Sequence, residues 1–239
     1  MSTNNIAPLQ IQTQLRKTAF YGCAMCGCPI LEYVHIVPYH NIQAFLPENM
    51  VALCPYHSIR YDLKEISESA LRGAKADPYN KVHQQDTFSI SSEEISVNVG
   101  KCIFVNTSRI LVVDDFDIIS IKREDGKYLL FDINFFDKLN NLIAIVCENS
   151  WSAERGSIDW SIIYKPRHLT IKNSSKNIIF DAEIKNNREI TITSDGMYYN
   201  RSPIRITENE ILLNNEEIAI DLKGTELRNY EVGIAAETL

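Results

Sequence analysis

The chain has 239 residues, of which 45% are hydrophobic and 23% are charged, and its formal net charge is −7. This composition is typical of folded proteins and excludes an intrinsically disordered chain. No run of 18 apolar residues occurs, so we expect no membrane-spanning segment, and the first 15 residues lack the features of a signal peptide. The six cysteines form no recognisable disulfide framework, which favours a cytoplasmic location.

The negative charge is unevenly distributed along the chain. Residues 1–80 hold six Lys and Arg against six Asp and Glu, whereas the remainder holds 18 against 25. Because affinity for nucleic acids comes largely from cations that neutralise phosphates, the acidic remainder is a poor candidate for a DNA-binding surface. Any contacts with DNA should come from basic residues of the first part, which are equally consistent with ordinary surface charges. They are Arg16, Lys17, Arg60, Lys64 and Arg72.

The first predicted element is a helix over residues 9–20. Its apolar residues recur at helical spacing, and they are Leu9, Ile11, Leu15 and Ala19. We interpret it as a packing helix that braces the segment immediately after it.

Two close pairs of residues with metal-binding side chains follow this helix. Cys23 and Cys26 form a C-x-x-C pair, Cys54 and His57 form a C-x-x-H pair, and 27 residues lie between them. Zinc binds thiolate and imidazole tetrahedrally, and each pair on a short turn supplies two corners of the tetrahedron. A redox C-x-x-C is typical of a βαβ unit, which is absent here, and buried apolar cysteines are more often single than paired. The spacing therefore predicts a structural zinc site.

Between the two pairs the sequence predicts two short strands, over residues 31–36 and 50–53, and then the start of a helix. Pro55 suits the first turn of that helix, where a missing N–H group has no partner to lose. A domain of this size buries little apolar surface. Bound zinc should therefore supply much of its folding free energy.

This stretch resembles the HNH endonucleases of the zinc-stapled ββα-metal type. Three motifs stand in the family's order, and they are His35-Ile36-Val37-Pro38, Asn49, and Leu53-Cys54-Pro55-Tyr56-His57. The resemblance covers roughly residues 16–80. It implies that His35 is the general base that activates water for phosphodiester cleavage, and that Asn49 orients this base or holds the loop.

Two positions depart from the family pattern. Val34 stands where the family has an Asp or His ligand of the catalytic metal, and Ser58 stands where it has the second ligand. Valine has no lone pair and a neutral hydroxyl binds divalent cations weakly, whereas cleavage by one metal requires a bound cation. Asp62, one helical turn after Ser58, and His40 are candidate substitute ligands for Mg²⁺ or another divalent metal.

A further helix is predicted over residues 66–76, with Ser67 as its N-cap and Asp77-Pro78 as its end. The polar residues 79–92 lack periodicity, so we interpret them as a linker in which His83 is exposed. We therefore expect an α+β protein with two domains. These are an HNH-like, zinc-binding ββα domain over residues 1–80 and an all-β domain over residues 90–239.

The second domain is predicted from short β-branched runs that recur every 8–12 residues or so, a pattern typical of a sandwich, a barrel or a β-solenoid. The predicted strands are residues 95–99, 102–105, 110–113, 118–122, 127–133, 142–147, 160–164, 169–172, 177–182, 189–192, 204–206, 210–213 and 217–220. Asp125-Gly126 predicts a hairpin turn.

Several single residues of this domain carry structural predictions. Cys102 and Cys147 are expected to be small core residues, and residues 233–239 a frayed terminus. At least one of Trp151 and Trp160 should lie in the core, the alternative being a binding surface for another protein.

Three functions remain open at this point. The first is a metal-dependent endonuclease in which His35 is the base and the basic residues of the first domain hold DNA. The second is a catalytically inactive HNH scaffold whose β domain contacts a protein partner or a second copy of the chain. The third is a defence or toxin-type effector. The lost ligands and the acidic second half favour the inactive scaffold, whereas the retention of His35 and Asn49 favours the nuclease.

Overall fold

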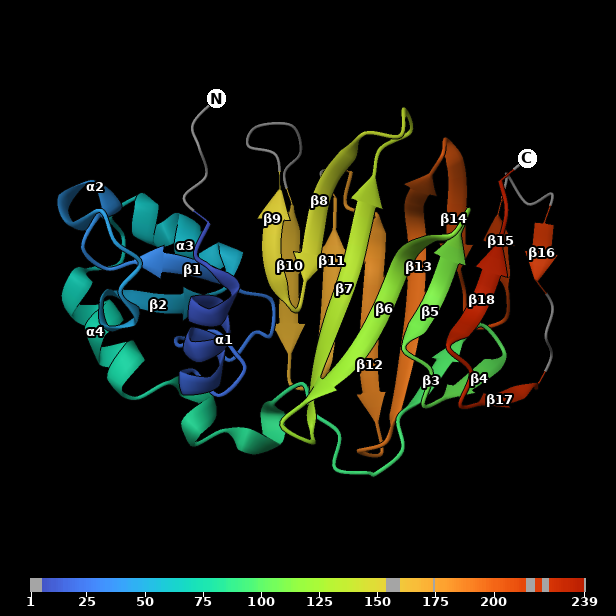
Figure 1. Ribbon diagram of the computed structural model, residues 1–239, viewed down its shortest axis with the longest axis horizontal. Helices are drawn as coiled ribbons and strands as arrows, with labels where there is room; N and C mark the ends of the chain where they lie inside the picture. The colour runs from blue at the N-terminus through green and yellow to red at the C-terminus, as the bar shows by residue number, and fades with distance from the viewer. Residues whose placement is uncertain (1–5, 154–159, 174, 214–217, 221–223, 239) are drawn as a thin grey trace. The chain divides into compact units, whose positions relative to one another are not determined.

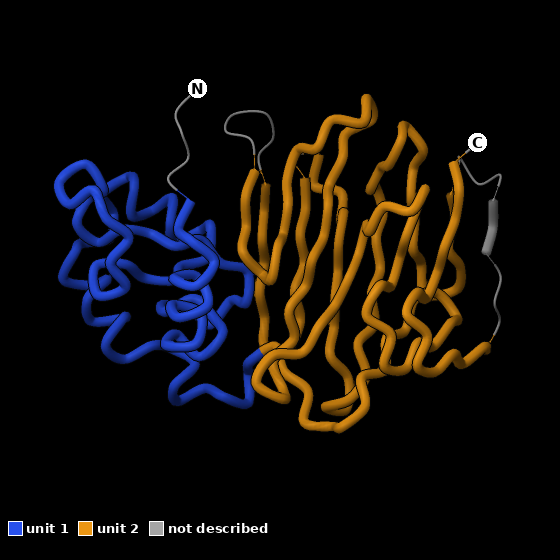
Figure 2. The backbone as a smooth tube through the Cα atoms, in the orientation of Figure 1, with its two compact units in different colours: residues 1–87 blue, residues 88–239 orange. Residues whose placement is uncertain are grey.

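The computed structural model describes residues 6–153, 160–173, 175–213, 218–220 and 224–238 (Figure 1). The chain divides into two compact units, which are residues 1–87 and residues 88–239 (Figure 2). Strands outnumber helices in the described part, so the protein is α+β with a large β content. Among the described residues, no helix has the length and apolar character needed to cross a membrane.

Unit 1 combines short helices with one two-stranded antiparallel sheet. Its elements in chain order are α1 (Leu9–Thr18), β1 (Glu32–His35), α2 (Tyr39–Ile42), η1 (Pro47–Asn49), β2 (Met50–Leu53), α3 (Pro55–Asp62), α4 (Glu68–Ala76), η2 (Tyr79–Lys81) and η3 (Gln84–Asp86), where η marks a 3-10 helix.

The local sequence accounts for most boundaries of unit 1. Pro55 is the first residue of α3, as its missing N–H group predicts. The Ser67 hydroxyl caps α4 by accepting a hydrogen bond from the Ala70 N–H group at 3.2 Å. Strands β1 and β2 pair with His35 opposite Met50 and Glu32 opposite Leu53, so the predicted hairpin partners meet in register.

Polar side chains brace the small apolar core of unit 1. Leu15 and Met50 pack together with Ala7, and Tyr33 and Phe45 lie against them. The Lys75 ammonium group of α4 donates to the backbone carbonyls of Pro47 and Met50, on either side of Asn49. Burial lowers the pKa of Lys75, because the charged form loses part of its hydration.

The regular secondary structure of unit 2, in its described residues, consists entirely of β-strands. They are β3 (Ser96–Val99), β4 (Cys102–Val105), β5 (Arg109–Val113), β6 (Phe116–Glu124), β7 (Tyr128–Phe136), β8 (Leu142–Cys147), β9 (Ser150–Ala153), β10 (Ser161–Lys165), β11 (His168–Lys172), β12 (Ile178–Lys185), β13 (Glu189–Tyr199), β14 (Ser202–Ile206), β15 (Ile211–Leu213), β16 (Ile218–Ile220), β17 (Glu226–Arg228) and β18 (Val232–Ala236).

These strands form two sheets. One has six strands in the order β18-β5-β6-β7-β8-β9. The other has ten, with β10 to β16 in sequence order, β3 added beside β13, and β4 and β17 beyond it. In Figure 1 the strands β6 and β7 pass in front of β12 and β13, which shows the two layers face to face.

The core of unit 2 lies between the two sheets. The rings of Phe131 in β7 and Phe180 in β12 meet edge to face with their centroids 5.4 Å apart, and both side chains are fully buried. Buried and less buried residues alternate along β12 and β13, as expected for strands with one face on a core. Unit 2 is therefore a two-layer arrangement of β-sheets with an apolar core between them.

Two predictions for unit 2 are corrected by the structure, and three of its strands were not predicted. Cys147 is exposed, because the alternation along β8 buries Val146 and turns its neighbour outward, whereas Cys102 is buried as expected. Residues 232–236 are not a frayed terminus, since they form β18 and pair in parallel with β5. Strands β9, β17 and β18 were not predicted.

The two tryptophans are partly buried rather than enclosed. Trp151 and Trp160 meet edge to face at 5.2 Å, and the buried Phe135 ring lies 6.2 Å from the first and 5.5 Å from the second. They therefore pack on the edge of the core of unit 2. The predicted strand 160–164 begins one residue later, at Ser161.

Candidate metal centre and the His35 loop

The two predicted ligand pairs come together in unit 1. The side-chain ligand atoms of Cys23, Cys26, Cys54 and His57 all lie within 4.8 Å of one another. Cys23 and Cys26 lie in the turn after α1, Cys54 is the N-cap of α3, and His57 is in its first turn. The cluster could hold a metal ion such as zinc.

Three distances between ligand atoms of this cluster match the edges of a zinc tetrahedron. With zinc–sulfur bonds of about 2.3 Å and zinc–nitrogen bonds of about 2.0–2.1 Å, ideal edges are about 3.8 Å between sulfurs and about 3.5 Å between sulfur and nitrogen. The Cys26 and Cys54 Sγ atoms are 3.7 Å apart. His57 Nδ1 lies 3.5 Å from Cys23 Sγ and 3.3 Å from Cys54 Sγ. All six cysteines of the chain are free thiols, so no disulfide competes for these ligands.

The protonation of the thiols also fits a cation site. Burial raises the pKa of the Cys23 thiol, because an isolated thiolate loses its hydration there. Hydrogen bonds from the thiols of Cys23 and Cys54 lower the pKa of Cys26. A bound divalent cation is what would stabilise the charge of several thiolates together.

A tight backbone turn presents Cys23 and Cys26. The Gly27 N–H group donates to the Cys23 carbonyl at 2.8 Å, and the Cys23 N–H group donates to the Cys28 carbonyl at 2.8 Å. Gly27 has a φ of 76°, a left-handed conformation that glycine adopts without steric cost. The Ala24 N–H group donates to the Ala52 carbonyl of β2 at 2.9 Å, which fixes the turn beside the strand that leads to Cys54.

His35 lies at the end of β1 in an aromatic setting. Its ring centroid is 5.2 Å from that of Tyr39 and 5.4 Å from that of Phe45. His35 Nε2 lies 3.3 Å from the Ala44 carbonyl oxygen. A carbonyl only accepts hydrogen bonds, so this contact requires a proton on Nε2, and in the neutral ring Nδ1 then keeps its lone pair.

Asn49 holds the loop that follows His35. Its side chain accepts from the Val37 N–H group and donates to the Val37 carbonyl, both at 2.9 Å, and only 6% of it is exposed. Tyr61 of α3 adds a third clamp, because its hydroxyl donates to the Ile36 carbonyl at 2.5 Å. Of the two roles that the HNH resemblance implies for Asn49, these contacts correspond to holding the loop.

Four positions were considered for a catalytic metal, namely Val34, Ser58, Asp62 and His40. Within the described residues, none of them belongs to a cluster of metal-binding side chains. Val34 pairs with Val51 in the hairpin, and Ser58 of α3 is 6% exposed. Asp62 and His40 are exposed, at the end of α3 and in α2. Across the described ranges, the Cys23–His57 cluster is the only group of three or more His, Cys, Asp and Glu close enough to hold a metal ion.

The structure changes the account of the basic residues. Arg16 is only 1% exposed, because α1 turns this side chain into the unit, so it cannot reach a phosphate backbone. Arg60 forms an ion pair with Glu65 at 2.8 Å and lies over the Tyr56 ring. Lys17, Lys64 and Arg72 are exposed. The phosphate-binding set inferred from the sequence therefore loses Arg16, and Arg60 is engaged elsewhere.

Three residues that support these sites were missed by the sequence analysis. Tyr61 and Lys75 clamp the backbone around the His35 loop and Asn49, and Asn80 is buried beside the Cys23–Cys26 turn. Asn80 lies in the stretch that we interpreted as a linker. Its neighbour Pro78 and its position just after α4 gave no sign of burial, because that burial arises from contacts distant in sequence.

Comparisons of this chain with protein-family models, with curated proteins and with solved structures find no match.

Proposed function

We propose that unit 1 is a zinc-stapled module of HNH type that acts by binding a partner rather than by cleaving phosphodiesters. The order β1, β2, α3 with the ligand pairs on both sides is the arrangement that the resemblance implies, and it supports the assignment. Thiolate and imidazole side chains at tetrahedral distances support zinc as the metal.

The zinc in this proposal is structural. The protein supplies all four corners of the tetrahedron, and such closed sites leave no position for water or substrate. When bound, the ion would neutralise the thiolates and join the turn after α1 to the start of α3. His57 and Cys54 then fix the N-terminal end of the helix that also carries Tyr61.

One observation carries the choice of binding over catalysis. The two positions where the HNH pattern has catalytic metal ligands hold a valine and a buried serine, Val34 and Ser58. His35 and its clamped loop could still hold or move a proton at Nδ1. A base alone does not stabilise the charge that develops on a phosphate during cleavage.

The charges of the module favour a protein partner over a nucleic acid. Arg16 is buried and Arg60 is paired with Glu65, which leaves the exposed Lys17, Lys64 and Arg72 of the inferred set to neutralise phosphates. We propose that the acidic unit 2 provides the contact with a protein partner or with a second copy of the chain.

A metal-dependent nuclease is the second candidate, and the orientation of His35 favours it. The Ala44 carbonyl holds Nε2 and leaves Nδ1 as a proton acceptor, which is the arrangement that a general base needs. In this alternative, Asp62 or His40 would hold the catalytic metal in place of the lost ligands.

A cleavage assay separates the two candidates. The full chain, shown by elemental analysis to carry zinc, is incubated with supercoiled plasmid and with single-stranded RNA in Mg²⁺, Mn²⁺ or Ni²⁺. The binding module predicts no cleavage above that of the His35→Ala variant. Restoring ligands as Val34→Asp with Ser58→His should then raise cleavage at least about 10-fold, because a cation could bind beside His35. The matched control is Val34→Ala with Ser58→Ala, which adds no ligand.

Two results would count against the proposal. Efficient cleavage by the wild type that disappears in His35→Ala supports the nuclease, and single substitutions of Asp62 and His40 would then identify the metal ligand. Freshly purified protein without stoichiometric zinc removes the metal assignment itself.

A further inference from the structure

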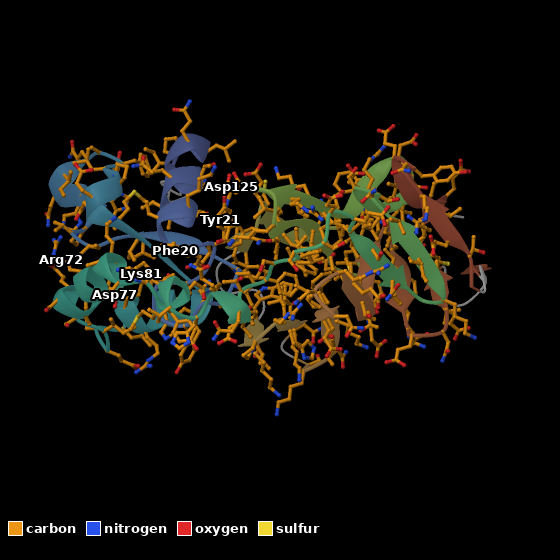
Figure 3. The ribbon with its side chains drawn as sticks, turned by 90° about the horizontal axis from the view of Figure 1, so that it is seen from below. Phe20, Tyr21, Arg72, Asp77, Lys81 and Asp125 are labelled. Carbon is orange, nitrogen blue, oxygen red and sulfur yellow. The ribbon has the colours of Figure 1, made fainter. Side chains whose placement is uncertain are left out.

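The buried side-chain amide of Asn80 lies against the turn that presents the metal ligands Cys23 and Cys26. The residue lies in η2, just after α4, and only 1% of it is exposed. Its Nδ2 group donates to the Phe20 carbonyl at 3.0 Å and reaches the Gly27 carbonyl at 3.5 Å. The Phe20 and Gly27 carbonyls lie on either side of the turn that presents Cys23 and Cys26. Phe20 is labelled in Figure 3.

The two glycines of the turn are shaped to receive this side chain. A Cβ atom on Gly22 would lie 2.2 Å from Asn80 Nδ2, and one on Gly27 would lie 2.3 Å from Asn80 Oδ1. Both distances are far inside van der Waals contact, so the amide fills the space that a side chain at either glycine would need. By contrast, a Cβ atom on Gly73 of α4 would meet nothing within 4 Å.

A backbone contact next to Asn80 completes the support. The Tyr79 N–H group donates to the Ala24 carbonyl at 2.9 Å, while the Ala24 N–H group donates to Ala52 of β2 at 2.9 Å. Ala24 lies between the first two ligands. The ligand turn is therefore held on one side by the strand that leads to Cys54 and on the other by η2.

We infer that Asn80, together with the Tyr79 N–H group, is a positioning element of the metal cage, and that metal loading orders the segment that leads into unit 2. The inference rests on the proposed zinc site and adds its coupling to residues 79–87. A donor that joins two turn carbonyls restricts the conformations of the turn, so the thiols are already placed when the cation arrives.

The coupling runs in both directions. If η2 favours the arrangement of the turn that binds metal, then bound metal must favour the docked arrangement of η2 to the same extent. The Tyr79 N–H group reports this docking directly, because its hydrogen bond to Ala24 protects it from exchange with solvent only while η2 is in place.

The test compares zinc release and amide exchange in the full-length, zinc-loaded protein. Asn80→Ala should release zinc to a chromogenic chelator about 10-fold faster than the wild type or more, in the range seen when outer-shell support of a metal site is removed. Asn149→Ala is the matched control, since Asn149 is also buried and bonds backbone groups of Leu129 and Phe131, but in unit 2. Its release rate should equal that of the wild type.

Two further readouts separate positioning from general stability. In Co²⁺-substituted protein, Asn80→Ala should alter the ligand-field spectrum, which a loss of stability elsewhere does not change. Hydrogen exchange should show residues 79–87 protected in the zinc-loaded wild type and unprotected in zinc-saturated Asn80→Ala, while the other helices of unit 1 keep their protection in both proteins.

A milder pair keeps the inference testable if Asn80→Ala fails to fold. Tyr79→Pro removes the N–H donor at the first position of η2, where proline is tolerated, and Tyr79→Ala removes the ring but keeps the donor. Faster zinc release in Tyr79→Pro than in Tyr79→Ala supports the inference, and equal rates overturn it. Zinc-loaded Asn80→Ala that behaves as the wild type also overturns it and leaves the proposed function intact. A wild type that binds no zinc removes both.

Discussion

The two units of this protein are held together by different kinds of interaction. Unit 1 buries several polar side chains, among them Arg16, Asn49 and Asn80, and gathers three thiols and an imidazole at one point. Unit 2 encloses a core of aliphatic and aromatic side chains between two sheets, with Phe104, Phe131 and Phe180 fully buried. Both units remove apolar area from water, since unit 1 also buries aliphatic side chains such as Ile30, Leu31 and Leu71. Unit 1 differs in adding a cage of metal-binding side chains to its core.

This difference predicts what each unit needs in order to fold. Zinc bound by a thiolate and imidazole cage adds binding free energy to that of the apolar core of unit 1, which includes Ile30, Leu31 and Leu71. The four ligands all lie in unit 1, and the described core of unit 2 consists mainly of aliphatic and aromatic side chains. Perturbations directed at the cage and at the sheets should therefore have separate effects.

Removing the metal should have the largest effect. Chelation, or Cys23→Ala, should unfold unit 1 and spare unit 2, because a structural zinc contributes about 10–16 kcal/mol of binding free energy against a domain stability of about 5–15 kcal/mol. Far-ultraviolet circular dichroism should lose its helical component. Tryptophan fluorescence should be unchanged, because both tryptophans belong to unit 2.

Cys147→Ala is the control for this experiment, since its thiol is exposed and lies outside the cage. It should leave both signals unchanged. A chelated wild type that keeps its helices and its amide protection in unit 1 would show that the polar clamps suffice without metal, and the comparison between the units would fail.

A cavity in the sheets should have the next largest effect, in the opposite unit. Phe131→Ala removes one ring of the pair that joins β7 to β12, and it should destabilise unit 2 by about 3–5 kcal/mol. Chemical denaturation followed by tryptophan fluorescence measures this loss. The zinc content should stay at the wild-type value. Phe116→Ala, at a ring that is 37% exposed, is the control and should cost much less.

The sequence predicted the features of both units that arise from local chemistry. The spacing of Cys23, Cys26, Cys54 and His57 was sufficient to bring them together, because two short turns supply two corners each. The hydroxyl of Ser67 caps α4 as predicted. Most strands of unit 2 were found within a few residues, since β-branched runs between polar turns are a local signal.

The remaining features depend on contacts between distant segments. Nothing in residues 232–236 marks them as a partner of β5, because a parallel pair needs no turn signal between its strands. Strand β13 continues to Tyr199, past the predicted end at residue 192, because a register shift near Gly196, at φ 120°, lets it bend and pair with β14. The burial of Arg16 and Asn80 is likewise set by packing.

The expected division into domains at residues 1–80 and 90–239 stays a prediction about independent folding. The compact units meet at residues 87 and 88, and the segment after residue 78 carries Asn80 into the core of unit 1. A fragment that ends at residue 80 would therefore keep Asn80 but remove η3, which follows it. A fragment of residues 1–87 is therefore the better choice for expressing unit 1 alone.

The smallest effect on stability is expected from an exposed polar contact of unit 2, the one between Asp114 and Thr238. If apolar burial sets the stability of this unit, a single exposed charge should contribute little. The Asp114 carboxylate accepts hydrogen bonds from the Thr238 hydroxyl and from the Thr238 N–H group, the latter at 2.8 Å, and these lower the pKa of Asp114. A lowered pKa in the folded state contributes stability above the unfolded value of about 3.9, and this contribution is lost as the pH falls through the folded value.

Because Asp114 is exposed and water screens its charge, Asp114→Asn should cost less than about 1 kcal/mol at pH 7. The difference from the wild type should be smaller at pH 2 than at pH 7, because the wild-type carboxyl loses its charge as the pH falls through its folded pKa. Denaturation followed by tryptophan fluorescence at both pH values measures it, and Asp115→Asn, at a neighbouring exposed carboxylate that does not bond Thr238, is the control. A loss in Asp114→Asn comparable to that of Phe131→Ala would mean that the strand ends of unit 2, and not its apolar core, set its stability.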